Sequence, residues 1–180
     1  MRFRRQPKLE GMIGELETEL LTRLAGEVED GCIVEIGSWR GMSTIALAKG
    51  ARVPVYAIEP HEHFVGVLGG VFGPDDRRAF FENLLNAGVV EHVRLVNLSS
   101  EVVTPGWQLP VGLLWVDGDH RYEAVKRDFS CWEPHLRGLV AFHDTIQPSL
   151  GSTQFVDELL ADAYELVEHV QGTKVLRRSQ

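Results

Sequence analysis

Cysteine is scarce in this sequence: 180 residues include only Cys32 and Cys131. Two thiols cannot supply the disulfide density of a small secreted scaffold, and each lies in an apolar pattern typical of a buried free thiol. There is no run of about 18 apolar residues, as a membrane span would need. The basic start, MRFRRQPKLEGM, is not followed by the apolar core of an export signal. These absences predict a reduced, cytoplasmic protein without a membrane span.

Basic residues are also outnumbered, since 18 Lys and Arg stand against 26 Asp and Glu and give a formal net charge of −8. Such a charge disfavours nucleic acids and anionic membranes as partners. With 44% apolar residues, 18 Gly and 8 Pro, the composition is that of a globular chain and excludes a low-complexity polymer. The length suits a single domain, 1–180, in which 1–30 form an N-terminal tail and helix.

Short apolar runs alternate with amphipathic patterns along the chain. The runs predict strands at 32–36, 53–58, 93–96, 111–116, 139–142, 165–170 and 173–176. Helical spacing covers 14–29, 43–49, 75–88, 121–136 and 153–163, whereas 61–74 is glycine-rich and has no period. Alternating strands and helices favour right-handed crossovers. We therefore expect an α/β fold with a Rossmann-like, doubly wound, seven-stranded sheet, mostly parallel with an antiparallel last strand, and with helices on both faces.

Acidic residues stand at the ends of several predicted strands: Glu35, Glu59, Asp117 and the pair His143-Asp144. In open sheets of this kind, ligands bind beyond the carboxyl ends of the strands. Carboxylates that converge there repel one another unless a cation or sugar hydroxyls lie between them. The pattern indicates a cationic or hydroxyl-rich ligand.

The turn after the first strand has glycines at Gly37 and Gly41, with Trp39 between them. A dinucleotide-binding turn needs a further glycine where Trp39 stands, so that the backbone can approach a pyrophosphate. Glu59 ends the second strand, where an acid commonly accepts hydrogen bonds from ribose hydroxyls. A nucleoside without a pyrophosphate fits both features.

Four runs carry a resemblance to a known family: IVEIGSWRGMSTIALA, VYAIEPH, LLWVDGDHRYEAVKRDF and GLVAFHDT. Together they resemble class I S-adenosylmethionine-dependent methyltransferases, in the small-molecule O-methyltransferase branch with a DGDH motif. The resemblance extends over roughly residues 10–177. It implies transfer of a methyl group from S-adenosylmethionine to a hydroxyl of a small-molecule acceptor.

The same resemblance implies a set of cofactor-binding residues: Glu35, Gly37, Ser38, Trp39, Ser43, Glu59, Pro60, Ser99, Ser100 and Asp117. Its motifs place the methionine end of the cofactor near Glu35, with the carboxylate at the helix start by Ser43. Glu59 then corresponds to the ribose-binding acid, and the segment at Ser99 flanks the adenine. For Ser99, a role as a plain helix N-cap is an equal alternative.

Methyl transfer to a neutral hydroxyl needs a base or a metal that removes the proton. The catalytic candidates are His120, Asp117 and His143, with His120 in the position of a proposed base and local hydrogen bonding as its alternative role. A divalent metal at Asp117, His143 and Asp144 is the other option. Metal-using relatives mostly have Asp or Glu where His143 stands, which favours a softer metal than magnesium or no metal. Asp119 is expected to cap the following helix.

Two other functions remain open from the sequence: a methyltransferase-like module that binds a nucleoside without turnover, and an NAD-dependent oxidoreductase, which Trp39 disfavours. His61 is close enough to Glu59 in sequence to approach the cofactor. The stretch from 61 to 74 is expected to be either a mobile flap over the cofactor or a packed loop. Exposed apolar residues on the N-terminal helix favour a homodimer.

Overall fold

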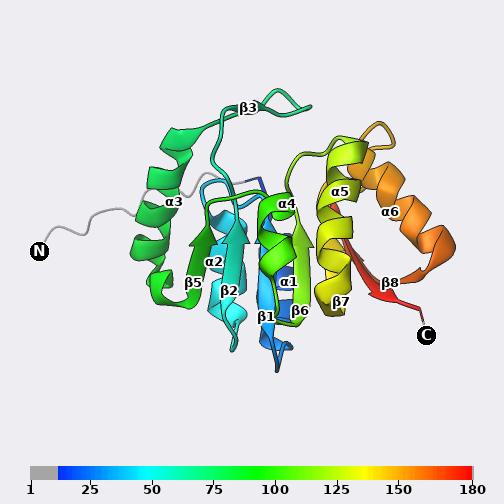
Figure 1. Ribbon diagram of the computed structural model, residues 1–180, viewed down its shortest axis with the longest axis horizontal. Helices are drawn as coiled ribbons and strands as arrows, with labels where there is room; N and C mark the ends of the chain where they lie inside the picture. The colour runs from blue at the N-terminus through cyan, green and yellow to red at the C-terminus, as the bar shows by residue number, and fades with distance from the viewer. Residues whose placement is uncertain (1–11, 180) are drawn as a thin grey trace, which may run out of the picture.

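The computed structural model describes residues 12–179, and its centre is one sheet. The strands are β1 (Cys32–Ile36), β2 (Val55–Ile58), β5 (Val93–Val96), β6 (Val111–Val116), β7 (Leu136–Phe142), β8 (Tyr164–Val170) and β9 (Thr173–Arg178). Their order is β5-β2-β1-β6-β7-β9-β8 (Figure 1). β5, β2, β1, β6 and β7 are parallel, whereas β9 is antiparallel to both β7 and β8. The predicted Rossmann-like sheet with an antiparallel last strand is confirmed.

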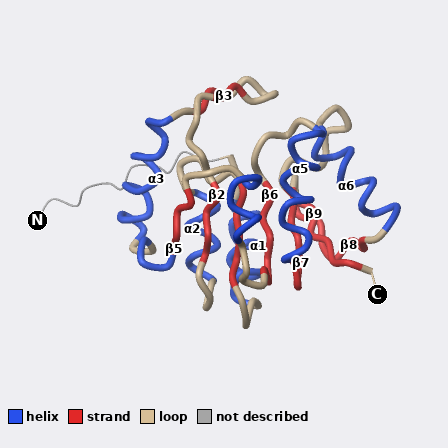
Figure 2. The backbone as a smooth tube through the Cα atoms, in the orientation of Figure 1, coloured by secondary structure: helices blue, strands red, loops and turns tan. Residues whose placement is uncertain are grey.

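Helices cover both faces of the sheet (Figures 1 and 2). They are α1 (Glu15–Gly26), α2 (Met42–Gly50), α3 (Pro74–Ala87), α4 (Ser100–Val103), α5 (Tyr122–Trp132) and α6 (Gly151–Asp162), with 3-10 turns at Val90–His92, Thr104–Gly106 and Glu133–His135. Buried residues of α1, α2 and α3 share one apolar cluster, and those of α5 and α6 share the other. In the part of the chain from 12 to 179, no helix has the length and apolarity needed to cross a membrane.

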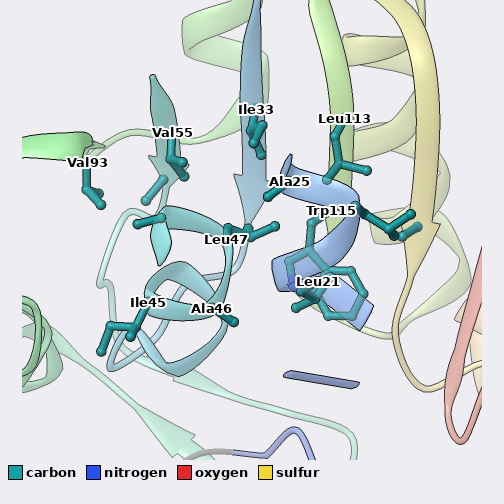
Figure 3. Packing of buried hydrophobic residues seen from close by; sticks show 14 of the residues in the cluster. Leu21, Ala25, Ile33, Ile45, Ala46, Leu47, Val55, Val93, Leu113 and Trp115 are labelled. Atoms are coloured by element: carbon teal, nitrogen blue, oxygen red, sulfur yellow. The ribbon is translucent and has the colours of Figure 1, made fainter. Parts of the chain in front are cut away.

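The central strands are buried on both faces, which explains their continuous apolar runs. Alternate residues of β6 point to opposite sides, so that Trp115 joins the cluster beneath α1 and Leu114 joins the one beneath α5. Figure 3 shows Leu21 of α1 beside Trp115, and both side chains are fully buried. This packing fixes α1 against the sheet immediately below the carboxyl ends of the strands.

The structure differs from the sequence prediction mainly in short elements. The stretch 61–74 contains a small hairpin, β3 (Phe64–Val65) paired with β4 (Val71–Phe72), in which the rings of Phe64 and Phe72 stack at 5.4 Å. Two-residue strands are too short to produce an alternating pattern, so the expectation of an irregular stretch was wrong there. The one-turn helix α4 was also not predicted. Residues 1–11 of the predicted N-terminal tail lie outside the described residues.

Candidate active site

A cavity of about 550 Å³ lies at the carboxyl edge of the sheet. Its wall is formed by the segments that follow β1, β2, β6 and β7, by the β3–β4 hairpin, and by Met12 and Ile13 just before α1. Figure 1 shows the hairpin above the carboxyl ends of the strands. The cavity is therefore at the edge where the sequence predicted a ligand, and its volume suits a cofactor-sized molecule.

The turn after β1 depends on Gly37. Its φ is 84°, in the left-handed region, and a Cβ built there would lie 2.3 Å from the carbonyl oxygen of Asp117. Only glycine combines that backbone conformation with so close an approach of the chain after β6. The turn continues through Trp39, whose φ is 42°. The two chain segments are thereby brought together along one wall of the cavity.

Glu59 follows β2 and is held by backbone amides. The amide of Trp39 donates to Oε2 at 3.1 Å, and the amide of His61 donates to Oε1 at 2.8 Å. The carboxylate is half-buried and lines the cavity. Each oxygen uses one acceptor position on the backbone, which leaves further lone pairs for a ligand. Glu59 is thus a carboxylate fixed by the backbone, with acceptor capacity left over at the cavity wall.

The cavity wall includes most of the residues that the sequence predicted for the cofactor: Gly37, Ser38, Trp39, Ser43, Glu59, Pro60, Ser99, Ser100 and Asp117. Glu35 is absent from it. That side chain is fully buried behind the turn, where the hydroxyl of Thr44 donates to its Oε2. Burial raises the pKa of Glu35 to about 8, although the hydroxyls of Ser43 and Thr44 partly oppose the shift. Glu35 therefore supports the turn from behind.

His61 is also placed differently from the sequence expectation. It is buried and is not part of the cavity wall; its Nε2 contacts the carbonyl oxygen of Trp39 at 2.9 Å. The side-chain amide of Asn97 donates to the carbonyl oxygens of Glu59 and Pro60, each at 2.7 Å. These contacts fix the backbone that carries the Glu59 carboxylate.

Asp128 is a residue of the cavity wall that the sequence analysis missed. It lies on α5 next to Ser100, and burial raises its pKa while the Ser100 hydroxyl opposes the shift. The signal was present in the helical pattern, because Asp128 follows Val125 by three residues and so interrupts the apolar face of the helix. Ser99 is the N-cap of α4 by its backbone, but its side chain makes no capping hydrogen bond.

Two histidines and three carboxylates meet where β6 and β7 end. His143 Nδ1 lies 3.0 Å from Asp117 Oδ1, and His143 Nε2 lies 3.4 Å from Oε1 of Glu17 on α1. His120 Nε2 lies 3.1 Å from Asp144 Oδ2 and 3.9 Å from Asp117 Oδ1. The three predicted catalytic residues are therefore in one group, and Glu17 is a member that the sequence analysis did not find.

The charges in this group shift the pKa values of both imidazoles. Burial lowers the pKa of His143, but the charge of Asp117 and its hydrogen bond, followed by Asp144 and Glu17, outweigh burial and raise it to about 9. Burial likewise lowers the pKa of His120, but the hydrogen bond that His120 donates to Asp144, together with the charges of Asp117 and Asp144, outweighs burial, so that the net shift of the pKa is upward. The His120 hydrogen bond holds the pKa of Asp144 below its usual range.

The geometry does not fit the metal site considered for Asp117, His143 and Asp144. Both ring nitrogens of His143 face carboxylate oxygens, so neither lone pair is directed at an open position. Within residues 12–179, no three or more His, Cys, Asp or Glu side chains are grouped to hold a metal ion. The expectation of a divalent metal is not supported.

Asp119 does not have the position that was expected, at the N-cap of the following helix. The N-cap of α5 is Arg121, whose backbone amide donates to Asp119 Oδ1 at 3.1 Å.

The β3–β4 hairpin contacts both sides of the cavity. Arg121 Nη2 donates to the carbonyl oxygen of Val65 at 3.1 Å, and its guanidinium lies 5.4 Å from the centre of the Phe64 ring. On the other side, the rings of Trp39 and Phe72 are nearly perpendicular, with their centroids 5.8 Å apart. Val67 and Leu68 at the hairpin tip are exposed yet also line the cavity. These contacts join the hairpin to Arg121 on one side of the cavity and to Trp39 on the other.

The sheet order, with a cofactor-sized cavity at the carboxyl edge, is that of a Rossmann-like methyltransferase fold, and comparison with known proteins agrees. A family model described as a methyltransferase domain matches residues 34–145, and the chain belongs to that family. The O-methyltransferase NovP has a similar structure, with a TM-score of 0.74 and 20% identity over 94% of this chain and 82% of that chain.

Other solved structures have the same fold. One is an O-methyltransferase from Bacillus cereus in complex with SAH (TM-score 0.71, 16% identity, 93% of this chain and 83% of that chain). Another is the O-methyltransferase TomG from Streptomyces achromogenes in complex with SAM (TM-score 0.69, 16% identity, 94% and 82%). At these identities the likeness establishes the fold, while the family match establishes the class of protein.

Proposed function

We propose that this protein is an S-adenosylmethionine-dependent O-methyltransferase that acts on a hydroxyl of a small molecule. The observation that carries the proposal is Glu59, a carboxylate fixed by two backbone amides at the wall of a cofactor-sized cavity. Its free acceptor positions suit the two hydroxyls of a ribose. The cofactors named for the O-methyltransferases of similar fold, SAM and SAH, contain that ribose.

The turn after β1 suits the methionine end of the cofactor. Ser43 is at the start of α2, where unpaired backbone amides and the helix dipole favour a carboxylate. Gly37 and Ser38 line the cavity beside it, and Asp117 is the nearby acid that can accept from an ammonium group. Ser99, Ser100 and Asp128 form the opposite end, where we place the adenine.

The bound cofactor supplies an electrophilic methyl group on a sulfonium centre and leaves as S-adenosylhomocysteine. The protein has to remove the proton of the acceptor hydroxyl, and His120 is the base that we assign. Asp144 accepts from Nε2–H, so the lone pair of the neutral ring is on Nδ1, which makes no hydrogen bond within the described part of the chain. His120 Nδ1 would accept the proton of the acceptor hydroxyl, which frees that oxygen to attack the methyl group that the cofactor would supply.

His143 has a different part in this proposal. Both of its ring nitrogens are engaged by carboxylates and its pKa is raised to about 9, so it is a fixed cation at neutral pH and a poor base. We assign it to hold Asp117 in place and to offset the negative charge at the end of β6. The reaction proposed here gives His143 no role as a metal ligand.

The small-molecule acceptor would enter beneath the hairpin, against Met12, Ile13 and Phe64. Short loops and one small hairpin line this side, so the acceptor pocket is the least constrained part of the site. A cytoplasmic location and a homodimer stay predictions of the sequence.

Replacing Glu59 tests the cofactor assignment. In Glu59→Ala, we expect the affinity for S-adenosylhomocysteine to fall about 10- to 100-fold, because two hydrogen bonds to a charged acceptor are lost. Isothermal titration calorimetry measures the affinity for S-adenosylhomocysteine, and a parallel titration with NAD tests the alternative cofactor. Glu91→Gln, which removes an exposed charge elsewhere, is the matched control. Tight binding of NAD and not of S-adenosylhomocysteine would contradict the proposal.

The hairpin gives a second expectation. We expect hydrogen exchange of the amides in 64–72 to slow about tenfold when S-adenosylhomocysteine is bound, because the ligand adds contacts to a weakly held cover. β8 (Tyr164–Val170), at the edge of the sheet and outside the cavity wall, is the internal reference. Unchanged protection across 61–74 would mean that the hairpin is a packed loop rather than a flap.

A further inference from the structure

Glu17 is a buried carboxylate whose position capping alone does not explain. It lies in the first turn of α1 with only 4% of its surface exposed. Its Oε2 accepts from the amide of Gly14 at 3.0 Å, as a capping residue does. A cap of this kind works equally well in solvent, and burying a carboxylate is unfavourable unless charged or hydrogen-bonding partners compensate. The contacts of the other carboxylate oxygen of Glu17, Oε1, identify these partners.

Oε1 of Glu17 joins α1 to two strands far away in sequence. The hydroxyl of Thr173 on β9 donates to it at 2.8 Å, and Nε2 of His143 at the end of β7 lies 3.4 Å away. His143 contacts Asp117 through its other nitrogen at 3.0 Å. Glu17, His143 and Asp117 therefore form a continuous chain from the N-terminal helix to the cavity wall.

Nothing else among the described residues is placed to fix the orientation of His143 at Nε2. The ring packs against Trp115, with centroids 5.6 Å apart, and its side chain is 5% exposed, so water does not compete for that nitrogen. Met12 and Ile13, which line the cavity, come just before the start of α1. The Glu17 carboxylate therefore contacts both the His143 ring and the start of the helix that follows this part of the cavity wall.

We propose that Glu17 is a positioning residue of the active site: its carboxylate fixes the His143 ring and, through that ring, the Asp117 carboxylate at the cavity wall. The inference rests on the proposed function only for its kinetic consequences. The structural consequence, an altered environment of the His143 imidazole, is measurable without any methyl acceptor.

Glu17→Gln is the test variant, because the amide oxygen can still accept from Thr173 while the charge facing His143 is removed. Glu19→Gln is the matched control, since Glu19 is exposed on the same helix. We expect kcat for methyl transfer to fall at least about tenfold in Glu17→Gln, as it does when the partner of a metal-binding histidine is lost, and the affinity for S-adenosylhomocysteine to fall as well, because Asp117 is assigned to the ammonium group of the cofactor. Glu19→Gln should match the wild type.

A double-mutant cycle separates positioning from a general structural effect. If Glu17 acts through His143, the double variant Glu17→Gln/His143→Gln has the same kcat as His143→Gln alone, whereas independent effects multiply. The proposal is overturned if the effects of the two substitutions on kcat multiply. It is also overturned if the wild type is active and Glu17→Gln has an unchanged kcat.

The imidazole resonances of His143, assigned by their loss in His143→Gln, decide the matter even if the wild type transfers no methyl group. We expect them to move in Glu17→Gln and to stay in place in Glu19→Gln; unmoved resonances overturn the proposal. Should Glu17→Gln fail to fold, Thr173→Val replaces it. That variant keeps the charge of Glu17 but removes the hydroxyl that holds its Oε1. We expect a smaller displacement of the same His143 resonances, and an absence of displacement would contradict the proposed role of Glu17.

Discussion

His120→Gln is expected to lower the rate of methyl transfer at least about 100-fold, the usual contribution of a general base. The substitution keeps a polar side chain of similar length beside Asp144 but removes the basic nitrogen that we assign to the acceptor proton. Affinity for S-adenosylhomocysteine should stay within about twofold, because His120 is assigned to the acceptor and not to the cofactor. Transfer of the tritiated methyl group of labelled S-adenosylmethionine to a panel of phenols and sugars measures the rate.

Two companion variants sharpen this expectation. Asp144→Asn keeps the base but loses the carboxylate that orients it, so we expect a smaller loss, about tenfold. His92→Gln, at an exposed histidine in the turn before β5, should leave the rate unchanged. A His120→Gln enzyme with wild-type activity would refute the role of His120. A wild type that binds the cofactor but methylates nothing in the panel would favour a binding module.

The second large effect is on stability. Glu35 is fully buried and its pKa is raised to about 8 from 4.5, chiefly by burial, so the folded protein keeps it protonated at neutral pH. Between these two values the folded state binds a proton that the unfolded state releases. Stability from this group is therefore complete below pH 4.5 and is lost progressively as the pH rises toward 8, by about 1.4 kcal/mol per pH unit.

Glu35→Gln resembles the protonated side chain at every pH and should not show this loss. We expect the variant to be more stable than the wild type at pH 7 by about 3 kcal/mol, with the difference growing as the pH rises from 5 to 8. Urea denaturation at a series of pH values gives the free energies of unfolding. Glu27→Gln, on an exposed part of the N-terminal helix region, provides the control. A difference that does not vary with pH would mean that Glu35 is ionised in the folded protein.

Much of the fold could be predicted because both faces of the sheet are covered. Continuous apolar runs such as 111–116 and the amphipathic stripe of 121–136 have lengths and periods that distinguish buried strands from helices. The boundaries were less predictable. A 3-10 turn at Glu133–His135, with Pro134 in its middle, follows the end of α5 at Trp132. β7 then starts at Leu136, three residues earlier than expected.

The site divides in the same manner. Strand-end residues such as Glu59 and Asp117 could be identified because a parallel sheet brings all carboxyl ends to one edge. Glu35 also belongs to a strand, but the direction of its side chain depends on the pleat of β1 and on the hydrogen bond from Thr44. The side chain therefore lies behind the cavity wall. Asp128 and Glu17 come from helix faces, whose neighbours depend on how each helix docks.

The sheet, the edge at which a ligand is expected and the class of protein could be inferred from periodicity and short motifs, because these are local in the chain. The surroundings of His143 could not. Glu17 and His143 are far apart in sequence, and α1 brings them together by packing Leu21 against Trp115. Such contacts depend on the docking of whole elements, which local patterns do not encode.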